Sequence, residues 1–347
     1  MIVKNYFGTT ADGRNVDCYT IKNTKETAVD IITYGATINS IYTADKNGAF
    51  ADVLIGFDTI EGHENYSDYQ GLPVGRYANR LAGGKFSIDG VEYNVEKNEK
   101  GITCLHGGGE YNSAHWNGEI ISDNAVKFTY FSPDGTEGFP GNVNVSATYT
   151  FTDDNKLSIE YKAVSDKKTV INLTNHAYFN LNGFDSGDVL SHTVKINADR
   201  FTAIDEVSIP TGELPEVKGT PFDFTEEKTI GRDINAESLQ LKNGNGYDHN
   251  FCISDFDGTL KTAAVAKADK SGITMEVKTD LPGVQLYTGN FLDGSVKGKN
   301  GVPMTQRCAF CLETQVYPDT PNHPEWPGCI YDAGEEYISH TVFSFSL

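Results

Sequence analysis

Two segments of alternating apolar and polar residues constrain the fold of this chain more than any other feature. The first runs from Val143 to Phe151 and the second from Leu157 to Ala163, with an apolar residue at every second position in both. A period of two is typical of a β-strand with one buried face. The short polar segment 152–156 joins the two runs, so the sequence predicts an antiparallel hairpin.

Further strand candidates lie on both sides of this hairpin. They are residues 28–33, 36–43, 53–57, 171–181, 192–196, 274–279, 284–288, 309–314 and 343–347, and turn residues separate many of them. Residues 53–57 are a continuous apolar run, which predicts a strand buried on both faces. The region from about 202 to 246 contains three prolines and is expected to be irregular, except for a short helix from Glu226 with Thr225 as its N-cap.

The composition favours an all-β protein. The chain has 35 glycines and 11% aromatic residues, together with many threonines, valines and isoleucines, which suit strands joined by tight turns. Large sandwiches and barrels often exceed about 200 residues as one unit. Because no internal repeat or low-complexity linker interrupts the sequence, we expect residues 1–347 to form a single domain.

The net charge excludes several classes of partner. Lys and Arg number 28 and Asp and Glu number 48, which gives a formal charge of −20 at pH 7. This charge repels nucleic-acid backbones and anionic membrane surfaces, so neither is an expected partner. With only six arginines in the chain, a neutral polar small molecule fits better than an anionic one.

The sequence predicts a cytoplasmic protein without a membrane partner. The N-terminal segment lacks an apolar core of secretory length, and no later segment has 18 consecutive apolar residues. The six cysteines are then expected to be reduced. Cys308 and Cys311 are three apart in a predicted strand and would point to opposite faces, so we expect no zinc site there. No pattern indicates an oligomeric state.

Two histidines are candidates for chemistry. His176 lies in the predicted strand 171–181, on the opposite face from Leu173 and Asn175, and histidine titrates near pH ~6.5. His106 precedes three glycines, which let the backbone approach a ligand closely. A hydrogen-bonded structural histidine is the alternative for His176. The next histidine after His106 is His115, so no local histidine pair of the cupin type indicates a metal.

Charged residues in unusual positions add further candidates. Glu313 lies in the otherwise uncharged segment 311–315, where a buried carboxylate is costly unless a partner or a function requires it. Asp248 follows flexible glycines, and the alternative there is a backbone cap. Arg76 and Arg80 lie in the glycine-containing segment 71–86, which lacks the spacing of a phosphate-binding loop. Solvated arginines in a surface turn are the alternative.

Taken together, these segments resemble the aldose 1-epimerase (galactose mutarotase) family. The motifs are Asn79-Arg80, Leu105-His106-Gly107, residues 172–181, Gly246-Tyr247-Asp248-His249, and Leu312-Glu313-Thr314-Gln315 followed by Pro318, Asp319, Pro321 and Asn322. Segments 35–37 and 53–57 also match, so the resemblance covers nearly the whole chain. It implies a large antiparallel β-sandwich with a few short helices and an open cleft across one sheet.

The resemblance also implies an activity and site residues. The activity is interconversion of the α and β anomers of a free hexose such as galactose or glucose, within hexose metabolism, with no cofactor and no metal. Glu313 matches the catalytic base, His176 the acid and His106 an assisting contact with the substrate. The residues that match the hydroxyl-binding set are Asn79, Arg80, Asp248 and Gln285.

Trp116 and Phe179 are candidates for covering an apolar face of the sugar, because aromatic rings stack on C–H faces. A position in the core is the more common role for a lone tryptophan.

Three alternative functions remain open from the sequence. The same fold could act on a hexose 6-phosphate, which would need a basic cluster for the phosphate. A sandwich with exposed aromatic residues could instead be a non-catalytic sugar-binding module. A glycoside hydrolase would use two carboxylates, for which Asp248 and Glu313 are candidates, but the histidines would then have no role.

Overall fold

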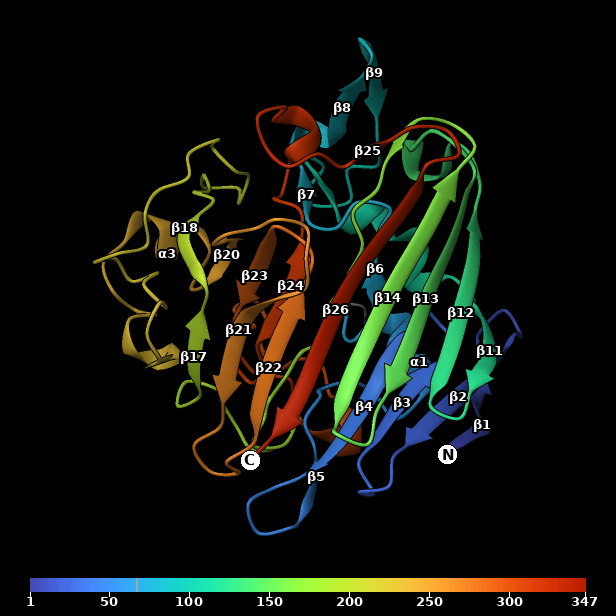
Figure 1. Ribbon diagram of the computed structural model, residues 1–347, viewed down its shortest axis with the longest axis vertical. Coiled ribbons are helices and arrows are strands. Elements are labelled where there is room, and N and C mark those ends of the chain that lie inside the picture. The colour runs from blue at the N-terminus through green and yellow to red at the C-terminus, as the bar shows by residue number, and fades with distance from the viewer. Residues whose placement is uncertain (67) are drawn as a thin grey trace.

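A computed structural model describes residues 1–66 and 68–347, and antiparallel β-sheets dominate it (Figure 1). The largest sheet has nine strands and forms the front layer in Figure 1. In sheet order its strands are β11 (Asn117–Ser122), β12 (Ala125–Ser132), β13 (Val143–Phe151), β14 (Lys156–Ser165), β26 (Glu336–Ser346), β22 (Thr274–Thr279), β21 (Lys261–Lys267), β17 (Thr193–Ile196) and β19 (Lys228–Thr229).

Two smaller sheets lie behind this layer and complete the sandwich (Figure 1). The five-stranded sheet is a meander in chain order: β1 (Ile2–Thr9), β2 (Asn15–Lys22), β3 (Ala28–Ile32), β4 (Thr37–Ala44) and β5 (Phe50–Asp52). The four-stranded sheet contains β18 (Ala198–Phe201), β20 (Asp248–Ile253), β23 (Gly283–Tyr287) and β24 (Cys311–Gln315). The predicted all-β sandwich is therefore confirmed.

Short elements connect the sheets. Four strand pairs are β6 (Pro73–Val74) with β16 (Thr174–Asn175), β7 (Arg80–Leu81) with β10 (Cys104–Leu105), β8 (Lys85–Ile88) with β9 (Val91–Asn94), and β15 (Thr169–Val170) with β25 (Ile330–Tyr331). The α-helices are α1 (Ile60–Asn65), α2 (Glu110–Ser113) and α3 (Leu239–Asn243). The 3-10 helices are η1 (Ala82–Gly84), η2 (His106–Gly109), η3 (Thr136–Gly138), η4 (Ile230–Arg232), η5 (Lys299–Gly301) and η6 (Thr320–Asn322). Within the described ranges, no helix has the length and apolar character needed to cross a membrane.

The predicted hairpin is confirmed as β13 and β14, which pair antiparallel with Val145 opposite Ala163 and Tyr149 opposite Ile159. These side chains belong to the largest cluster of buried apolar residues, which draws members from Tyr19 to Phe345. Burying an aliphatic or aromatic side chain contributes about 1.5–3 kcal/mol.

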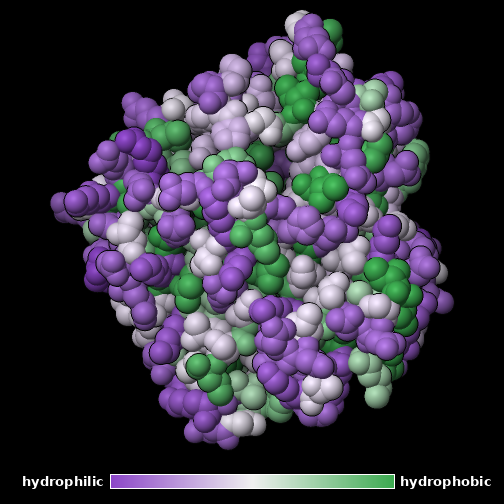
Figure 2. All heavy atoms as spheres, viewed as in Figure 1, coloured by the Kyte–Doolittle hydropathy of each residue, from purple (hydrophilic) through white to green (hydrophobic). Residues whose placement is uncertain are grey.

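The outer face is mainly hydrophilic, with apolar groups scattered over it (Figure 2). All six cysteines are free.

The predicted strand at 53–57 is wrong, although the segment is buried as expected. Its backbone bonds to several neighbours in turn: the amide of Val53 donates to Ile41 and the amide of Ile55 donates to Tyr178. Only Leu54 forms an isolated bridge. An apolar run thus indicates burial but does not guarantee one continuous strand partner.

The predicted helix from Glu226 is also wrong, because the chain there is extended and enters β19 and then η4. Lys228 explains the difference. Its ammonium is drawn inward to the carboxylate of Asp233 at 2.9 Å and lies 4.0 Å from the centre of the Phe224 ring. The helix of this region is α3, which begins further along the chain at Leu239.

A buried ion pair offers a test of the fold. The ammonium of Lys299 lies 2.6 Å from Asp52 and also donates to Ser40 and to the carbonyl of Leu54, and both charged side chains are about 5% exposed or less. We expect Asp52→Asn to lower the free energy of unfolding by about 3–5 kcal/mol, because it leaves a buried ammonium without its counter-charge. Urea unfolding measures this change.

The matched control is Glu92→Gln, since Glu92 pairs with Lys85 at the surface and both side chains are more than half exposed. This substitution should change the free energy of unfolding by less than about 1 kcal/mol. Equal losses in the two variants would contradict the importance of the buried pair.

Candidate active site

The floor of the site is one face of the four-stranded sheet. In the ladder, Gln285 lies opposite Glu313 and Asp248 lies opposite Tyr287. Because side chains alternate across a strand, these residues share one face, while Leu286 and other residues of the opposite face enter the apolar core. The sheet register therefore brings Glu313 and Asp248 together from positions 65 residues apart in sequence.

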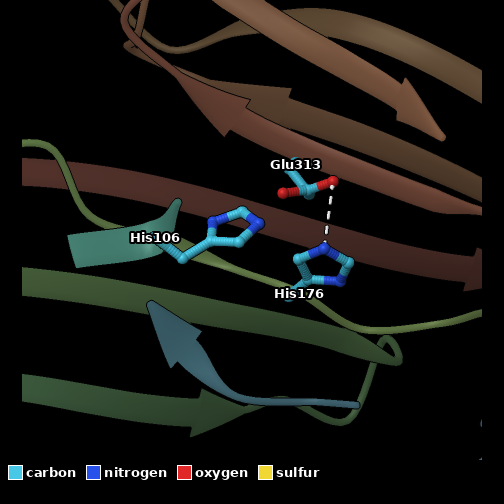
Figure 3. A group of neighbouring side chains, drawn as sticks. All are labelled: His106, His176 and Glu313. Atoms are coloured by element: carbon cyan, nitrogen blue, oxygen red, sulfur yellow. Dashed lines mark ion pairs between the residues drawn. The ribbon is translucent and has the colours of Figure 1, made fainter. Parts of the chain in front are cut away.

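His176 comes from the segment 171–181, which is a strand only at β16 and is otherwise extended backbone. Leu173 and Phe179 pack in the core, as the predicted alternation requires, and His176 faces the other way. Its Nε2 lies 3.6 Å from Oε1 of Glu313 (Figure 3). This separation is too long for a hydrogen bond, so the two groups face each other without being joined.

His106 is held by reciprocal backbone bonds with Asn79. The amide of His106 donates to the carbonyl of Asn79 at 3.0 Å, and the amide of Asn79 donates to Nδ1 of His106 at 3.1 Å. Both residues have positive φ, +53° for His106 and +65° for Asn79. Such a backbone costs energy in residues other than glycine, and it persists where the surroundings enforce it.

Gly107 explains the glycine that follows His106 in the sequence. A Cβ at this position would lie 2.2 Å from the carbonyl oxygen of Gly75, and the φ of Gly107 is +74°. Only glycine fits, because any side chain would push His106 away from the site.

Six of the seven predicted residues line one cavity of about 240 Å³: Asn79, Arg80, His106, His176, Asp248 and Glu313. The volume equals that of roughly eight water molecules. It is also below the range of about 300–1,000 Å³ that is typical of sites for drug-sized ligands. The cavity therefore suits a ligand of the size of a single sugar.

Gln285 occupies a different place from the other six. It does not belong to the cavity lining, and its Nε2 donates to Oδ1 of Asp248 at 2.7 Å. Its Oε1 accepts a hydrogen bond from Gln315 at 3.2 Å. The structure thus puts Gln285 behind Asp248, where it holds that carboxylate in position.

Arg80 is the buried cation of the site. Its Nε and Nη2 both donate to Glu99 at 2.9 Å, and its Nη1 lies 3.6 Å from Asp248. Burial lowers the pKa of Arg80, but the carboxylates of Asp248 and Glu99 outweigh it and hold that pKa above its ordinary value. Arg76 is also buried, with its guanidinium bound to Ser132 and nearby carbonyls. The alternative of solvated arginines in a surface turn is therefore wrong.

Burial also shifts the two facing groups toward their neutral forms. It raises the pKa of Glu313 well above 4.5, an effect that Asp248 reinforces and Arg80 opposes. Burial, together with the positive charge of Arg80, lowers the pKa of His176 to about 4. Both shifts therefore favour a protonated Glu313 and an unprotonated His176. Oε2 of Glu313 is buried without a hydrogen-bond partner among the described residues, so a ligand can use it.

The cluster His106, His176 and Glu313 is close enough to hold a metal ion, because its ligand atoms lie within 4.8 Å of one another. The hydrogen bonds of His106 argue for a different role. A histidine that binds a metal normally donates from its other ring nitrogen, whereas Nδ1 of His106 accepts the amide hydrogen of Asn79. The proton of the neutral ring is therefore on Nε2, which makes His106 a hydrogen-bond donor.

Several cavity residues escaped prediction. Tyr69 and Tyr178 lie nearly parallel to the His176 ring, with centroid distances of 5.7 and 5.0 Å, and Glu99 reaches Arg80 from a loop. Tyr178 was detectable, since it is two residues from His176 and so shares its face. Glu99 and Tyr69 lie in irregular segments, where sequence periodicity gives no signal.

Trp116 and Phe179, the two candidates for covering an apolar face of the sugar, do not line the cavity. Trp116 is buried against Tyr111 and Tyr130, and Phe179 packs against Phe343 in the core. Both side chains fill space in the interior of the sandwich.

Known proteins resemble this chain over most of its length. The sequence profile of the aldose 1-epimerase family matches residues 17–344. Bovine galactose mutarotase is 44% identical over 320 residues, covering 92% of this chain and 91% of its own length. Aldose 1-epimerase of Escherichia coli is 37% identical over 338 residues and covers 96% of both chains.

Solved structures agree as well. The GalM/aldose epimerase homologue from C. elegans superposes with a TM-score of 0.85 at 30% identity, covering 94% of this chain and 98% of its own. Galactose 1-epimerase from Lactobacillus acidophilus has a TM-score of 0.87 at 26% identity, covering 100% of this chain and 98% of its own. This chain therefore belongs to the aldose 1-epimerase family.

Proposed function

We propose that this aldose 1-epimerase interconverts the α and β anomers of a free hexose such as galactose or glucose, with Glu313 as base and His176 as acid. The observation that supports these roles is the pair itself. A carboxyl group and an imidazole face each other across 3.6 Å in a cavity of the size of one sugar, without a hydrogen bond between them. The name galactose mutarotase among the relatives supports galactose as a substrate.

The chemistry needs two proton carriers at once. Opening the pyranose requires removal of the proton from the hydroxyl on C1 and addition of a proton to the ring oxygen O5, so that the C1–O5 bond breaks. The carboxylate of Glu313 takes the first proton and the imidazolium of His176 gives the second. Rotation about C1–C2 then presents the other face of the aldehyde. When the ring closes, the two groups exchange roles and both return to their starting protonation states.

The electrostatics of the cavity match the midpoint of this cycle. Ring opening transfers the one proton of the pair from His176 to Glu313, which leaves both groups neutral. Burial favours these neutral forms, because it raises the pKa of Glu313 and lowers that of His176. The open-chain intermediate is therefore flanked by groups in their preferred states, and the proton on Glu313 is available for closure.

The remaining residues bind the sugar. His106 donates a hydrogen bond from Nε2, since its Nδ1 is occupied by the amide of Asn79. Arg80 and Asp248 supply a charged donor and a charged acceptor for sugar hydroxyls, and such charge-assisted bonds are strong and directional. Gln285 contributes through Asp248, which it holds at 2.7 Å. Holding the hydroxyls places O1 and O5 at the acid and the base.

A cytoplasmic location and a place in hexose metabolism belong to the same proposal. The place in hexose metabolism is supported by membership of the aldose 1-epimerase family, and the cytoplasm is the compartment we propose for that role. Cell fractionation with an antibody to the protein tests the location.

The first prediction concerns Glu313→Gln. This variant keeps the shape of the side chain but cannot accept a proton, so the mutarotation rate should fall by at least about 10²-fold. Polarimetry of freshly dissolved α-D-galactose measures the rate, beside a buffer blank that gives the spontaneous reaction. Glu92→Gln, at the surface, should leave the rate unchanged. Full activity of Glu313→Gln would contradict the assignment.

The same variant separates an enzyme from a sugar-binding module. Glu313→Gln should still bind the sugar, because Arg80, Asp248 and His106 remain in place. A module without catalysis would show no acceleration by the wild type either. Release of nitrophenol from a nitrophenyl galactoside would indicate the hydrolase alternative, which the two histidines disfavour.

The second prediction is a bell-shaped dependence of kcat on pH. At low pH a second proton enters the pair, and because burial lowers the pKa of His176 to about 4, this limb should lie well below the ordinary histidine value of ~6.5. At high pH the pair loses its last proton, and the raised pKa of Glu313 moves this limb above the ordinary carboxyl range. Stopped-flow polarimetry across the pH range measures both limbs. A flat profile from about pH 4 to about pH 10 would contradict an acid–base pair.

The third prediction concerns phosphorylated sugars. Four carboxyl groups line the cavity, those of Asp68, Glu99, Asp248 and Glu313, against two cations, Arg80 and Lys100. Arg80 is already engaged by Glu99. We therefore expect kcat/KM for glucose 6-phosphate to be at least about tenfold lower than for glucose, because like charges in a desolvated site cost well over 1 kcal/mol. A preference for the phosphate would instead support the 6-phosphate alternative.

A further inference from the structure

Arg80 directs two of its hydrogen-bond donors to one carboxylate that the proposed reaction does not use, that of Glu99. A guanidinium carries five N–H donors in a rigid plane. Its Nε and Nη2 edge is bound to both oxygens of Glu99 at 2.9 Å. This two-bond contact fixes the plane, so Nη1 is the part of the group turned toward Asp248 and the cavity.

The gap between Arg80 and Asp248 is unusual for a buried ion pair. Nη1 lies 3.6 Å from Oδ2 of Asp248, although both side chains are less than 10% exposed and carry opposite charges. Gln285 holds Asp248 by its other oxygen at 2.7 Å. Glu99 and Gln285 thus hold the two charges from opposite sides, and neither charge satisfies the other.

The loop that presents Glu99 is anchored beside His106. Asn98 accepts a hydrogen bond from the amide of Leu105 at 2.7 Å and donates to the carbonyl of the same residue at 2.9 Å. Glu99 itself forms a backbone bridge with Thr103. Since Leu105 precedes His106, the loop positions the carboxylate of Glu99 relative to the same strand pair that carries Arg80 and His106.

We propose that Glu99 is a positioning residue for sugar binding: it keeps the guanidinium of Arg80 from closing onto Asp248, so that both charged groups remain available to the same sugar hydroxyls. This inference rests on the proposed function. Without Glu99, Arg80 can rotate about its side-chain torsions and form a direct ion pair with Asp248, and the sugar then has to break that pair to bind. The loss of Glu99 therefore weakens sugar binding more than it slows the proton transfers.

The test uses Glu99→Gln in the full-length protein. Gln keeps the shape but loses the charge and one of the two hydrogen bonds, since its amide group faces a donor. We expect the Kd for 1,5-anhydrogalactitol, a galactose analogue without an anomeric hydroxyl, to rise about tenfold or more by calorimetry, as charge-assisted bonds of this kind suggest. The KM for galactose should rise in parallel while kcat changes less, and the limbs of the pH profile should stay in place.

Matched variants separate positioning from a purely structural role. Glu99→Asp keeps the charge at a shorter reach and should give an intermediate Kd. Glu92→Gln, at the surface, should give the wild-type Kd. If Glu99 has only a structural role, Glu99→Gln will have a lower melting temperature but its folded fraction will bind the sugar with the wild-type Kd. That result would overturn the proposal. If Glu99→Gln does not fold, a wild-type Kd in Glu99→Asp overturns it instead.

A double-mutant cycle with Arg80→Lys makes the test specific. If Glu99 acts through Arg80, Glu99→Gln should add little to the loss of affinity already caused by Arg80→Lys. Full additivity of the two losses would overturn the proposal. If the wild type binds no sugar, the proposed function fails and this inference fails with it. If the wild type binds and Glu99→Gln binds equally well, only the role of Glu99 is lost.

Discussion

The structure depends on keeping two buried ionisable groups close together but unbonded. Glu313 and His176 are 2% and 4% exposed, and 3.6 Å separates their facing atoms. Without restraint from the backbone, a buried carboxyl group and a buried imidazole would move closer and form a hydrogen bond. Strand register fixes Glu313 from one side, and the extended segment around His176 fixes the imidazole from the other. The two backbones therefore determine the distance between these two groups.

The same principle of restrained pairs recurs around the cavity. Nη1 of Arg80 lies 3.6 Å from Oδ2 of Asp248, while Glu99 binds the guanidinium and Gln285 binds the carboxylate. His106 and Asn79 adopt positive φ values and compensate by bonding to each other's backbone. Some of the strained and unsatisfied groups of this molecule, among them His106, Asn79 and Oε2 of Glu313, thus lie where a ligand is to bind, and others are spread over the rest of the sandwich. The stability of the sheets offsets the free-energy cost of this local strain.

Sequence analysis succeeded where the physical signal is periodic. Alternation predicted the β13–β14 hairpin and the opposite orientations of Leu173 and His176, and the family motifs identified six residues that line the cavity. It failed where tertiary context decides. The run 53–57 is buried without a strand ladder, and Lys228 draws the chain near Glu226 into an extended path that helix signals do not reveal.

The residues that were missed share a cause. Glu99 and Tyr69 come from irregular segments, so no period places them in the cavity. Gln285 matched a family motif, yet only the three-dimensional contact shows that its amide faces Asp248 and not the cavity. A sequence pattern can assign a residue to a face of a strand, but which of two neighbours on that face reaches the ligand depends on side-chain contacts across strands.

The arrangement also reconciles two demands on the enzyme that conflict at first sight. The sugar must be held firmly enough to align O1 and O5, and the open chain must be free to rotate about C1–C2. In the proposed mechanism Arg80 and Asp248 meet the first demand by binding sugar hydroxyls in a cavity of about 240 Å³. In the same mechanism Glu313 and His176, which are not hydrogen-bonded to each other, exchange protons with the sugar and place no fixed restraint on the aldehyde. Firm binding and free rotation are thus assigned to different residues of the same cavity.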